Sequence, residues 1–177
     1  MKNYNIVLIG FMGSGKTYTA RALSKILKLK VFSTDGLIEK KERMPVVRIF
    51  EKKGEKYFRR QEAEVVANLA KKKNVIIDCG GGIVLNPLNI KRLRKSGVLI
   101  YLKTSPEWIY KRVKLNKKRP LLQVKNPMAK IKAMLKERGP LYAQADAAVN
   151  TDAKTPLQVA QEIVSLFSCS CCAGRKL

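Results

Sequence analysis

The sequence predicts an α/β fold in which helices cover both faces of a five-stranded parallel β-sheet. Short apolar runs rich in β-branched residues alternate with longer segments whose apolar residues recur at helical spacing. Glycine-rich or polar residues follow directly after several of these runs, at the sheet edge where α/β proteins bind ligands. The length of 177 residues fits one domain of this kind.

The first predicted strand, Ile6–Ile9, is a run of apolar residues typical of a strand buried on both faces. The next segment, from Thr17 to Leu29, carries apolar side chains three or four positions apart and predicts a helix. Several later helices start at a proline, and Ser105 is the expected N-cap of the helix that begins at Pro106. The other strands are expected at Val31–Phe32, Val75–Ile77, Val98–Leu102 and, at the edge of the sheet, Ala147–Val149. The other helices are expected at about 37–43, 45–54, 55–73, 87–95, 106–115, 127–142 and 156–167.

The first strand leads directly into Gly10-x-x-x-x-Gly15-Lys16-Thr17, the pattern of a phosphate-binding loop. Glycines allow the backbone to curl until successive N–H groups point at phosphate oxygens. In this pattern the lysine reaches the β- and γ-phosphates, and the threonine hydroxyl is a ligand of Mg²⁺. The following helix adds the positive end of its dipole. We therefore expect a nucleoside triphosphate and Mg²⁺, bound by Gly10, Met12, Gly13, Ser14, Gly15, Lys16 and Thr17.

The composition is that of a soluble globular protein, with 46% apolar and 28% charged residues. No apolar run is long enough to span a membrane, and the start of the chain lacks a signal-peptide pattern, so we expect a cytoplasmic location. The net charge is +24, from 37 Lys and Arg against 13 Asp and Glu. The lysines are spread along the chain, in every predicted helix except that at 156–167, and no nucleic-acid-binding motif is present. We therefore interpret most of this charge as solvated helix surface and do not expect nucleic acid as a partner.

Four cysteines and the absence of histidine limit the possible chemistry. Cys79 ends an apolar run and is expected to be a buried thiol. The other three, Cys169, Cys171 and Cys172, have no recognised metal-binding spacing, so we expect 168–177 to be a disordered, reduced tail after a single domain at 1–167. Without histidine, any general base must be a carboxylate, a lysine or a tyrosine.

Two further polar segments follow strands and so belong to the ligand-binding edge. Asp35 comes just after the second strand, where its carboxylate could orient an acceptor hydroxyl and take its proton. N-capping of the next helix is the alternative role for Asp35. Gly80, Gly81 and Gly82 follow the third strand, and three glycines in a row indicate that a ligand or another segment approaches the backbone closely.

Several arginines are candidates for binding anionic groups. Arg59 and Arg60 lie at the start of a predicted helix, where the helix dipole disfavours cations, so the pair indicates a nearby anion. Arg119 lies in a polar stretch at about 116–126 that fits a mobile lid, and an arginine there can close over a transferring phosphoryl group. Arg138 could offer a guanidinium fork to a carboxylate.

Taken together, these features resemble the shikimate kinases over residues 4–167. The resemblance rests on the order and spacing of Gly10–Thr17, Thr34-Asp35 before Ile38-Glu39, Ile49-Phe50 and Gly54-Glu55 ahead of Phe58-Arg59-Arg60-x-Glu62, Gly80–Gly82, Arg119-Pro120-Leu121-Leu122, and Arg138-x-Pro140-Leu141-Tyr142. It implies a three-layer P-loop fold with a mobile lid, like that of nucleoside monophosphate kinases, and ATP-dependent phosphorylation of the 3-hydroxyl of shikimate. It also implies a monomer.

The same resemblance implies roles for individual residues. Asp35 would contact the acceptor hydroxyls and act as the base, while Lys16 and Arg119 would complete the catalytic group at the phosphates. Arg112 would lie against the adenine ring. Shikimate would be bound by Asp35, Phe50, Phe58, Arg59, Gly80, Gly81, Gly82 and Arg138.

One departure from the family pattern concerns the metal. The family usually has Asp-x-Asp after the second strand, and the first of these acids helps to hold the metal through water. Here that position is Ser33. Asp78, however, ends the third strand, where P-loop proteins carry a Walker-B aspartate, so we expect Thr17 and Asp78 at the metal site.

Three other functions are compatible with parts of the sequence. The chain could be a kinase for another small acid such as gluconate, or for a nucleoside monophosphate. It could also be a basic, nucleotide-dependent nucleic-acid-binding protein, or a relative that binds ATP and has lost catalysis through Ser33.

Overall fold

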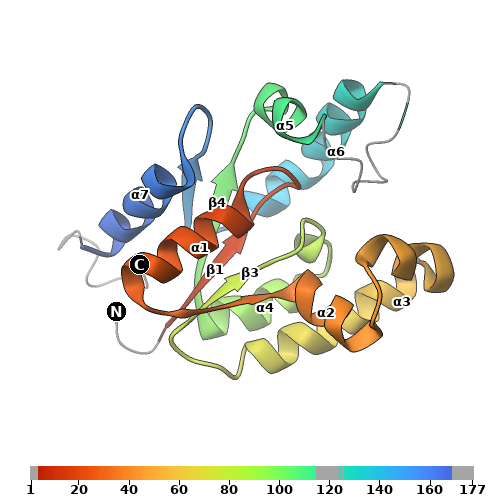
Figure 1. Cartoon of the computed structure of the whole chain (residues 1–177), viewed down its shortest axis with the longest axis horizontal. Helices are drawn as coiled ribbons and strands as arrows, with labels where there is room; N and C mark the ends of the chain where they lie inside the picture. Colours follow the sequence, from red (N-terminus) through yellow and green to blue (C-terminus); the bar gives the residue numbers. More distant parts are fainter. Residues whose placement is uncertain (1–3, 115–123, 125, 169–177) are drawn as a thin grey trace.

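The computed structural model describes residues 4–114, 124 and 126–168, and in it the predicted five-stranded parallel sheet is present (Figure 1). The strands lie in the order β2-β3-β1-β4-β5, so the strand that leads into the phosphate loop is the central one. The strands are β1 (Asn5–Ile9), β2 (Lys30–Ser33), β3 (Val75–Asp78), β4 (Gly97–Lys103) and β5 (Ala147–Asn150). The helices are α1 (Lys16–Leu27), α2 (Thr34–Glu42), α3 (Val46–Leu69), α4 (Pro87–Ser96), α5 (Pro106–Val113), α6 (Pro127–Tyr142) and α7 (Pro156–Ser168), with a short 3₁₀ helix, η1 (Ile83–Leu85), after β3.

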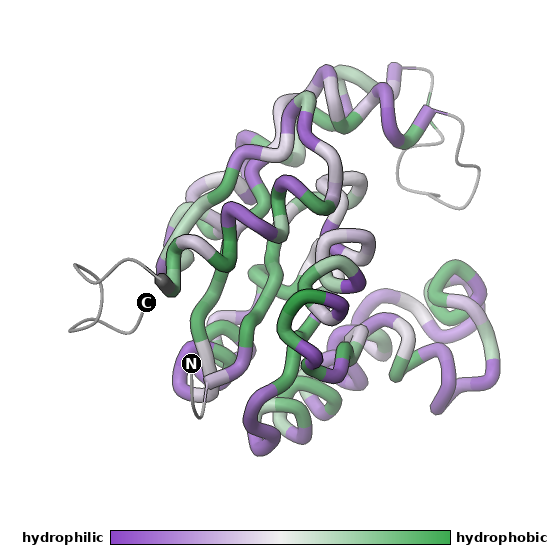
Figure 2. Tube along the Cα trace, turned by 60° about the vertical axis from the view of Figure 1, so that its left-hand side comes forward, coloured by the Kyte–Doolittle hydropathy of each residue, from purple (hydrophilic) through white to green (hydrophobic). Residues whose placement is uncertain are grey.

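Helices cover both faces of this sheet, and the central strand β1 contributes alternate side chains to the two faces. Val7 and Ile9 belong to the core that the sheet forms with α3, α4, α5 and α6. Ile6 and Leu8 belong to the core that it forms with α1 and α7. Apolar residues accordingly run along the central strands in Figure 2, while hydrophilic residues are frequent on the outer helices. The three-layer prediction is confirmed.

The predicted strands are all present within one or two residues of their expected bounds, and β5 is an edge strand as predicted. Helix α2 begins at Thr34, three residues before its predicted start. Ser33 causes this difference, because its Oγ accepts a hydrogen bond from the backbone N–H of Gly36 and caps the helix. The Thr34–Gly36 segment is therefore the first helical turn.

The two helices predicted on either side of Gly54 are present as the two parts of α3, which is broken at that glycine. Gly54 has φ 78° and ψ 167°, a backbone conformation that is essentially restricted to glycine. A side chain at this position would meet no atom within 4 Å, so the conformation and not the available space requires glycine. The second part of α3 ends at Leu69, short of the predicted Lys73.

Helices α2 and α3 pack against each other and extend beyond the sheet on the side of β2 (Figure 1). Their contact buries Ile38, Ile49 and Phe58 in a small apolar cluster of its own. Glu42 on α2 accepts hydrogen bonds from Lys53 (2.6 Å) and Tyr57 (2.8 Å), which flank the break in α3. These contacts hold the bent helix α3 beside the carboxyl ends of the strands.

Cys79 is fully buried just after β3, as expected, and burial raises the pKa of its thiol. None of the described helices is long and apolar enough to cross a membrane. Most of the predicted lid, and all of the cysteine-rich tail apart from Ser168, lie outside the described residues.

Candidate active site

The phosphate loop connects the buried end of β1 to the start of α1. Gly10, Gly13 and Gly15 have φ angles of 147°, 83° and 92°, a range in which other residues are strained. A side chain on Gly13 would also lie 2.6 Å from Val113 Cγ1 of α5. The ammonium of Lys16 donates hydrogen bonds to the carbonyls of Gly10 (2.8 Å) and Phe11 (2.9 Å). The glycines and the lysine of the sequence motif therefore hold the loop in one conformation.

A cavity of about 390 Å³ opens beside this loop. It is lined by Gly13, Ser14, Gly15, Lys16, Thr17, Tyr18, Thr19, Arg112, Val113, Thr151, Lys154, Pro156 and Val159. The size is within the range of small-molecule pockets, and the lining extends from the phosphate loop to the start of α7. The cavity is therefore the candidate nucleotide pocket.

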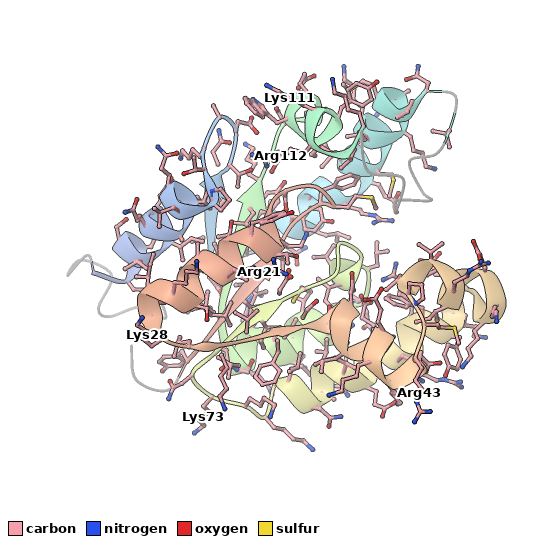
Figure 3. All side chains as sticks on the ribbon, in the orientation of Figure 1. Arg21, Lys28, Arg43, Lys73, Lys111 and Arg112 are labelled. Carbon is pink, nitrogen blue, oxygen red and sulfur yellow. The ribbon has the colours of Figure 1, made fainter. Side chains whose placement is uncertain are left out.

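Arg112 forms one side of this pocket (Figure 3). Its guanidinium donates hydrogen bonds to the hydroxyl of Thr151 (3.0 Å) and to the carbonyl of the same residue (2.6 Å). Partial burial lowers the pKa of Arg112, and the carboxylate of Asp152 opposes that shift. Arg112 therefore lines the candidate nucleotide pocket, and its contact with an adenine ring stays a prediction.

Thr17 and Asp78 lie together next to the loop. The hydroxyl of Thr17 donates a hydrogen bond of 2.7 Å to Oδ2 of Asp78, which is 4% exposed at the end of β3. In the described part of the chain, no three His, Cys, Asp or Glu side chains gather into a dedicated metal cage. This oxygen pair fits Mg²⁺, because Mg²⁺ is usually held by one or two protein groups together with phosphate oxygens and water.

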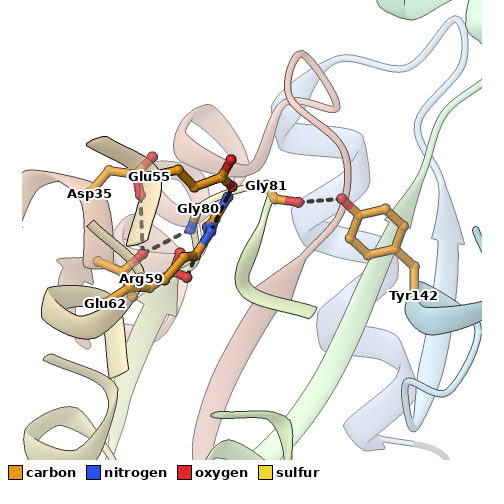
Figure 4. A network of polar contacts seen from close by, with 8 residues as sticks. Asp35, Glu55, Arg59, Glu62, Gly80, Gly81 and Tyr142 are labelled. Carbon is orange, nitrogen blue, oxygen red and sulfur yellow. Dashed lines mark hydrogen bonds and ion pairs between the residues drawn. The ribbon is translucent and has the colours of Figure 1, made fainter. Parts of the chain in front are cut away.

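The glycine triplet after β3 lies close to the phosphate loop and to two residues predicted to bind the acceptor, Asp35 and Arg59. Figure 4 shows Gly80 and Gly81 near these two side chains. A side chain on Gly80 would lie 2.3 Å from Oδ1 of Asp35, and one on Gly82 would lie 2.4 Å from the terminal nitrogens of Arg59. A side chain on Gly81 would approach the backbone nitrogen of Met12 to 3.2 Å. The predicted close approach to this backbone is confirmed: a methyl group on Gly80 or Gly82 would displace the side chain of Asp35 or Arg59, and one on Gly81 would press on the backbone of Met12.

Asp35 lies in the first turn of α2 with its carboxylate against Gly80. The alternative role considered for Asp35, that of an N-cap, is wrong because Ser33 caps α2. The neighbouring Thr34 accepts a hydrogen bond of 2.8 Å from the backbone N–H of Gly80 and lies 3.5 Å from Oδ1 of Asp35. These contacts join the start of α2 to the end of β3 and fix the position of the Asp35 carboxylate.

Arg59 is held between two glutamates. Its Nε and Nη2 donate to Oε1 of Glu55 at 3.1 and 2.9 Å, and its Nη1 donates to Oε2 of Glu62 at 2.9 Å (Figure 4). Burial raises the pKa of the fully buried Glu62 carboxyl to about 7, Arg59 opposes this shift, and Asp35 adds to it. Arg59 thus faces the glycine triplet in a fixed orientation.

Arg59 and Arg60 do not lie at the start of a helix, which the interpretation from the helix dipole required. Both lie in the second turn after the break at Gly54. Arg60 is exposed, with its guanidinium 5.3 Å from the centre of the Tyr57 ring. Only Arg59 contacts the glycine triplet, since neighbouring helical side chains point in different directions.

Tyr142 of α6 contacts the triplet, and Arg138 of the same helix lies beside Tyr142. Arg138 is 9% exposed, and its Nε has no hydrogen-bond partner within the described part of the chain. The hydroxyl of Tyr142 donates to the carbonyl of Gly81 (Figure 4), and its ring stacks on Tyr101 with the ring centres 5.2 Å apart. Burial raises the pKa of Tyr142, so the hydroxyl remains a donor. A buried arginine with an available donor suits an anionic ligand.

Phe50 and Phe58 lie together on α3, with ring centres 4.8 Å apart. The guanidinium carbon of Arg59 lies 5.4 Å from the centre of the Phe58 ring. The two predicted apolar residues are thus next to the predicted substrate arginine. Arg119, the predicted lid arginine, lies outside the described residues.

Four residues with contacts at the site had no predicted role: Glu55, Glu62, Tyr142 and Thr151. The spacing of Glu62 three residues after Arg59 was an available signal, because residues three apart face each other on a helix. Thr151 forms a hydrogen bond with Arg112, 39 residues away, and Tyr142 forms one with Gly81, 61 residues away. No local sequence pattern indicates such contacts.

The sequence was compared with those of known families, and a sequence model of the shikimate kinases matches residues 12–168. The chain belongs to the shikimate kinase family. Members of the family are ATP-dependent kinases that phosphorylate a hydroxyl of shikimate. This chain is therefore an ATP-dependent kinase that acts on a hydroxyl of shikimate.

Individual shikimate kinases are similar to this chain over most of its length. The shikimate kinase of Caldanaerobacter subterraneus subsp. tengcongensis is 45% identical over 163 residues, which cover 92% of this chain and 95% of the relative. The shikimate kinase of Pelotomaculum thermopropionicum is 46% identical over 160 residues, which cover 90% and 93% of the two chains.

Solved structures of small-molecule kinases are also similar to this structure. The shikimate kinase from Acinetobacter baumannii in complex with shikimate has a TM-score of 0.90 to this structure, with 37% identity and 93% coverage of both chains. A gluconokinase from Sinorhizobium meliloti has a TM-score of 0.60 at 16% identity, covers 94% of this chain and 92% of its own, and shares the fold alone.

Proposed function

We propose that this chain transfers the γ-phosphoryl group of ATP to the 3-hydroxyl of shikimate. The products are shikimate 3-phosphate and ADP, a reaction of chorismate and aromatic amino acid biosynthesis. The contact of Gly80, Gly81 and Gly82 with Asp35, the phosphate loop and Arg59 carries this proposal. This contact brings the carboxylate of Asp35 and the guanidinium of Arg59 to the phosphate-binding loop. Phosphoryl transfer to a hydroxyl of a small acid requires a group that orients the hydroxyl and a cation that binds the acid, both close to the phosphates.

On the nucleotide side, the backbone of Gly10–Gly15 and the ammonium of Lys16 would bind the phosphates. Arg112 would lie against the adenine ring, and its hydrogen bonds to Thr151 support that orientation. Thr17 would hold Mg²⁺, which when bound neutralises negative charge that develops on the transferring group. The residues around the loop thus position the γ-phosphoryl group for in-line attack.

On the acceptor side, the carboxylate of shikimate would bind Arg59 and Arg138. Each charge-assisted hydrogen bond of this kind contributes roughly 1.5–3 kcal/mol. Phe50 and Phe58 would form an apolar wall of the pocket. Asp35 would accept a hydrogen bond from the attacking hydroxyl and take its proton. The order of these residues around Gly80–Gly82 supports an acceptor with a carboxylate at one end and a hydroxyl at the other.

Arg119 would close over the phosphates and stabilise the charge of the transition state. Removal of an arginine with this role costs about 10³–10⁵ in rate. Closure would also exclude water from the site and so limit hydrolysis of ATP. We further propose that the protein works as a monomer in the cytoplasm, which light scattering on a size-exclusion column and fractionation of cells would test.

A panel of acceptors tests the proposal. ADP formation is measured with ATP and Mg²⁺ in the presence of shikimate, gluconate or a nucleoside monophosphate, and with no acceptor. We expect shikimate alone to raise the rate above the acceptor-free background. Turnover with gluconate or a nucleotide, and none with shikimate, would identify a different acceptor. Salt-dependent binding of RNA or DNA without any kinase activity would favour a nucleic-acid-binding protein.

A further inference from the structure

Asp78 lies where three neighbouring strands end. The parallel register pairs Asp78 of β3 with Leu8 of β1 on one side and with Ser33 of β2 on the other. Asp78 is 4% exposed, although the residue after it leads into the glycine triplet of the site. A carboxylate is therefore held, nearly buried, beside the loop that would bind the phosphates.

The hydrogen bond from Thr17 to Asp78 determines what the threonine can offer to a ligand. A hydroxyl has one proton and two acceptor lone pairs. The proton of Thr17 points at Oδ2 of Asp78 over 2.7 Å, so only lone pairs remain for a third atom. A hydroxyl in this orientation suits a cation and does not suit a phosphate oxygen, which needs a donor.

Ser33 is differently engaged. Its Oγ accepts a hydrogen bond from the backbone N–H of Gly36 and so caps α2. The serine side chain carries no charge. Ser33 and Asp78 lie opposite each other on β2 and β3, and of these two residues only Asp78 carries a negative charge.

A carboxylate beside a polyphosphate is repelled by it unless a cation lies between the two. We propose that Asp78 is the carboxylate of the Mg²⁺ site: it orients Thr17 as an oxygen ligand, holds the metal through water, and makes the loop prefer the Mg²⁺ complex of a nucleotide over the free nucleotide. This inference rests on the nucleotide half of the proposed function and is independent of the acceptor.

The test measures nucleotide affinity with and without Mg²⁺. Trp108 is the only tryptophan, and Arg112 of the nucleotide pocket lies 5.7 Å from its ring centre, so its fluorescence serves as the signal for titration with ADP. Asp78→Asn should bind free ADP as well as the unchanged protein does, or more tightly, because a negative charge is removed. Its gain in affinity on addition of Mg²⁺ should fall at least tenfold. An unchanged gain with Mg²⁺ would overturn the proposal.

Asp152→Asn is the matched control. Asp152 accepts the backbone N–H of Ser105 at 3.0 Å near Arg112, and asparagine can keep that hydrogen bond. The control removes one negative charge from the nucleotide side without touching Thr17, so its gain with Mg²⁺ should equal that of the unchanged protein. An equal loss in both variants would mean that net charge, and not the Thr17–Asp78 contact, sets the effect, which also contradicts the proposal.

A second variant keeps the test decisive if Asp78→Asn does not fold. Ser33→Asp combined with Asp78→Ser moves the carboxylate to the adjacent strand position in the same register. We expect this double variant to regain at least part of the Mg²⁺ preference, and a folded double variant without any preference would count against the proposal. Since ADP binding needs no shikimate, a protein that prefers Mg²⁺–ADP and yet fails to phosphorylate shikimate would refute only the proposed function.

Discussion

The guanidinium of Arg59 donates to Glu55 on one side and to Glu62 on the other, and a side chain on Gly82 would collide with its nitrogens. Two carboxylates therefore hold the side chain of Arg59, and the missing side chain at Gly82 leaves room for it. An arginine held in this way can bind a carboxylate without first being ordered, which reduces the entropy cost of binding. The position of Arg59 thus depends on a residue without a side chain as much as on its charged partners.

Gly82→Ala tests this dependence. Its methyl group would lie 2.4 Å from the terminal nitrogens of Arg59, so the guanidinium must move away. We expect the KM for shikimate to rise at least tenfold and the affinity for ADP to stay the same. Gly139→Ala on α6 is the control, because a methyl group there meets nothing within 4 Å, and it should leave both constants unchanged. An unchanged KM in Gly82→Ala would show that Arg59 does not bind the acceptor.

Asp35→Asn tests the proposed base. The change keeps the size of the side chain and removes its ability to take a proton. Loss of a general base costs about 10²–10⁴ in rate, so we expect kcat to fall by that order while the Kd for ATP remains unchanged. Steady-state kinetics and a fluorescence titration give the two values. If the variant turns over at a comparable rate, Asp35 is not the base.

Glu62 predicts a pH dependence of stability. Its folded-state pKa of about 7 lies above the usual glutamate pKa of 4.5, so between these values the folded protein binds the proton more tightly than the unfolded chain does. The resulting stability is complete below about pH 4.5 and is lost as the pH rises through about 7. The loss amounts to roughly 3 kcal/mol at most.

Urea unfolding at several pH values measures this effect. Glutamine does not titrate, so Glu62→Gln should show a smaller fall in unfolding free energy between pH 5 and pH 7.5 than the unchanged protein. Parallel pH profiles of the two proteins would exclude a raised pKa at Glu62.

At the scale of elements, the broken helix α3 places the acceptor residues. Its first part carries Phe50 and its second part carries Phe58 and Arg59, and the break between them at Gly54 turns the two parts relative to each other. Glu42 of α2 contacts residues on both sides of the break. The angle of α3, and with it the distance between these side chains and the triplet, depends on one glycine.

Gly54→Ala should therefore affect both stability and binding. The φ and ψ angles of Gly54 cost other residues about 1–3 kcal/mol, although there is space for a methyl group. We expect a loss of stability of this order in thermal unfolding and a higher KM for shikimate, because relaxation of the strain moves Phe58 and Arg59. Gly139→Ala again serves as control. Full stability in Gly54→Ala would contradict the role given to the break.

The elements themselves could largely be predicted from local sequence. The apolar run of β1 and the prolines at the starts of α4, α5, α6 and α7 correspond to elements found within a few residues of their expected ends. The start of α2 was missed because Ser33 and Asp35 are both good capping residues, and only the hydrogen bond to Gly36 shows which one caps. The 3₁₀ helix η1 follows the triplet and has no signal of its own.

At the scale of the whole molecule, the parallel sheet brings distant segments to one edge. The phosphate loop after β1, Asp35 after β2 and the triplet after β3 are adjacent because those three strands are neighbours. Once the strands are recognised, this part of the site follows from the sequence. The spacing of Glu62 after Arg59 was a usable signal, but the burial that raises its pKa was not predictable from local sequence. The role of Tyr142 could not be predicted, because it arises where α6 packs against the triplet.

The net charge of +24 also belongs to this scale. Cations lie on widely separated parts of the surface, as Lys28, Arg43, Lys73 and Lys111 illustrate in Figure 3. Several described acidic side chains are ion-paired, among them Glu42, Glu64 and Glu162. This distribution agrees with the interpretation of most of the charge as solvated helix surface.

Identification of the phosphorylated atom tests the central claim most directly. The protein is incubated with ATP, Mg²⁺ and shikimate, and the product is examined by phosphorus–proton correlation NMR. The account predicts a phosphorus nucleus coupled to the proton on carbon 3 of shikimate, with one ADP formed for each product molecule. Phosphate on another hydroxyl, or ADP formation with only free phosphate as the product, would contradict it.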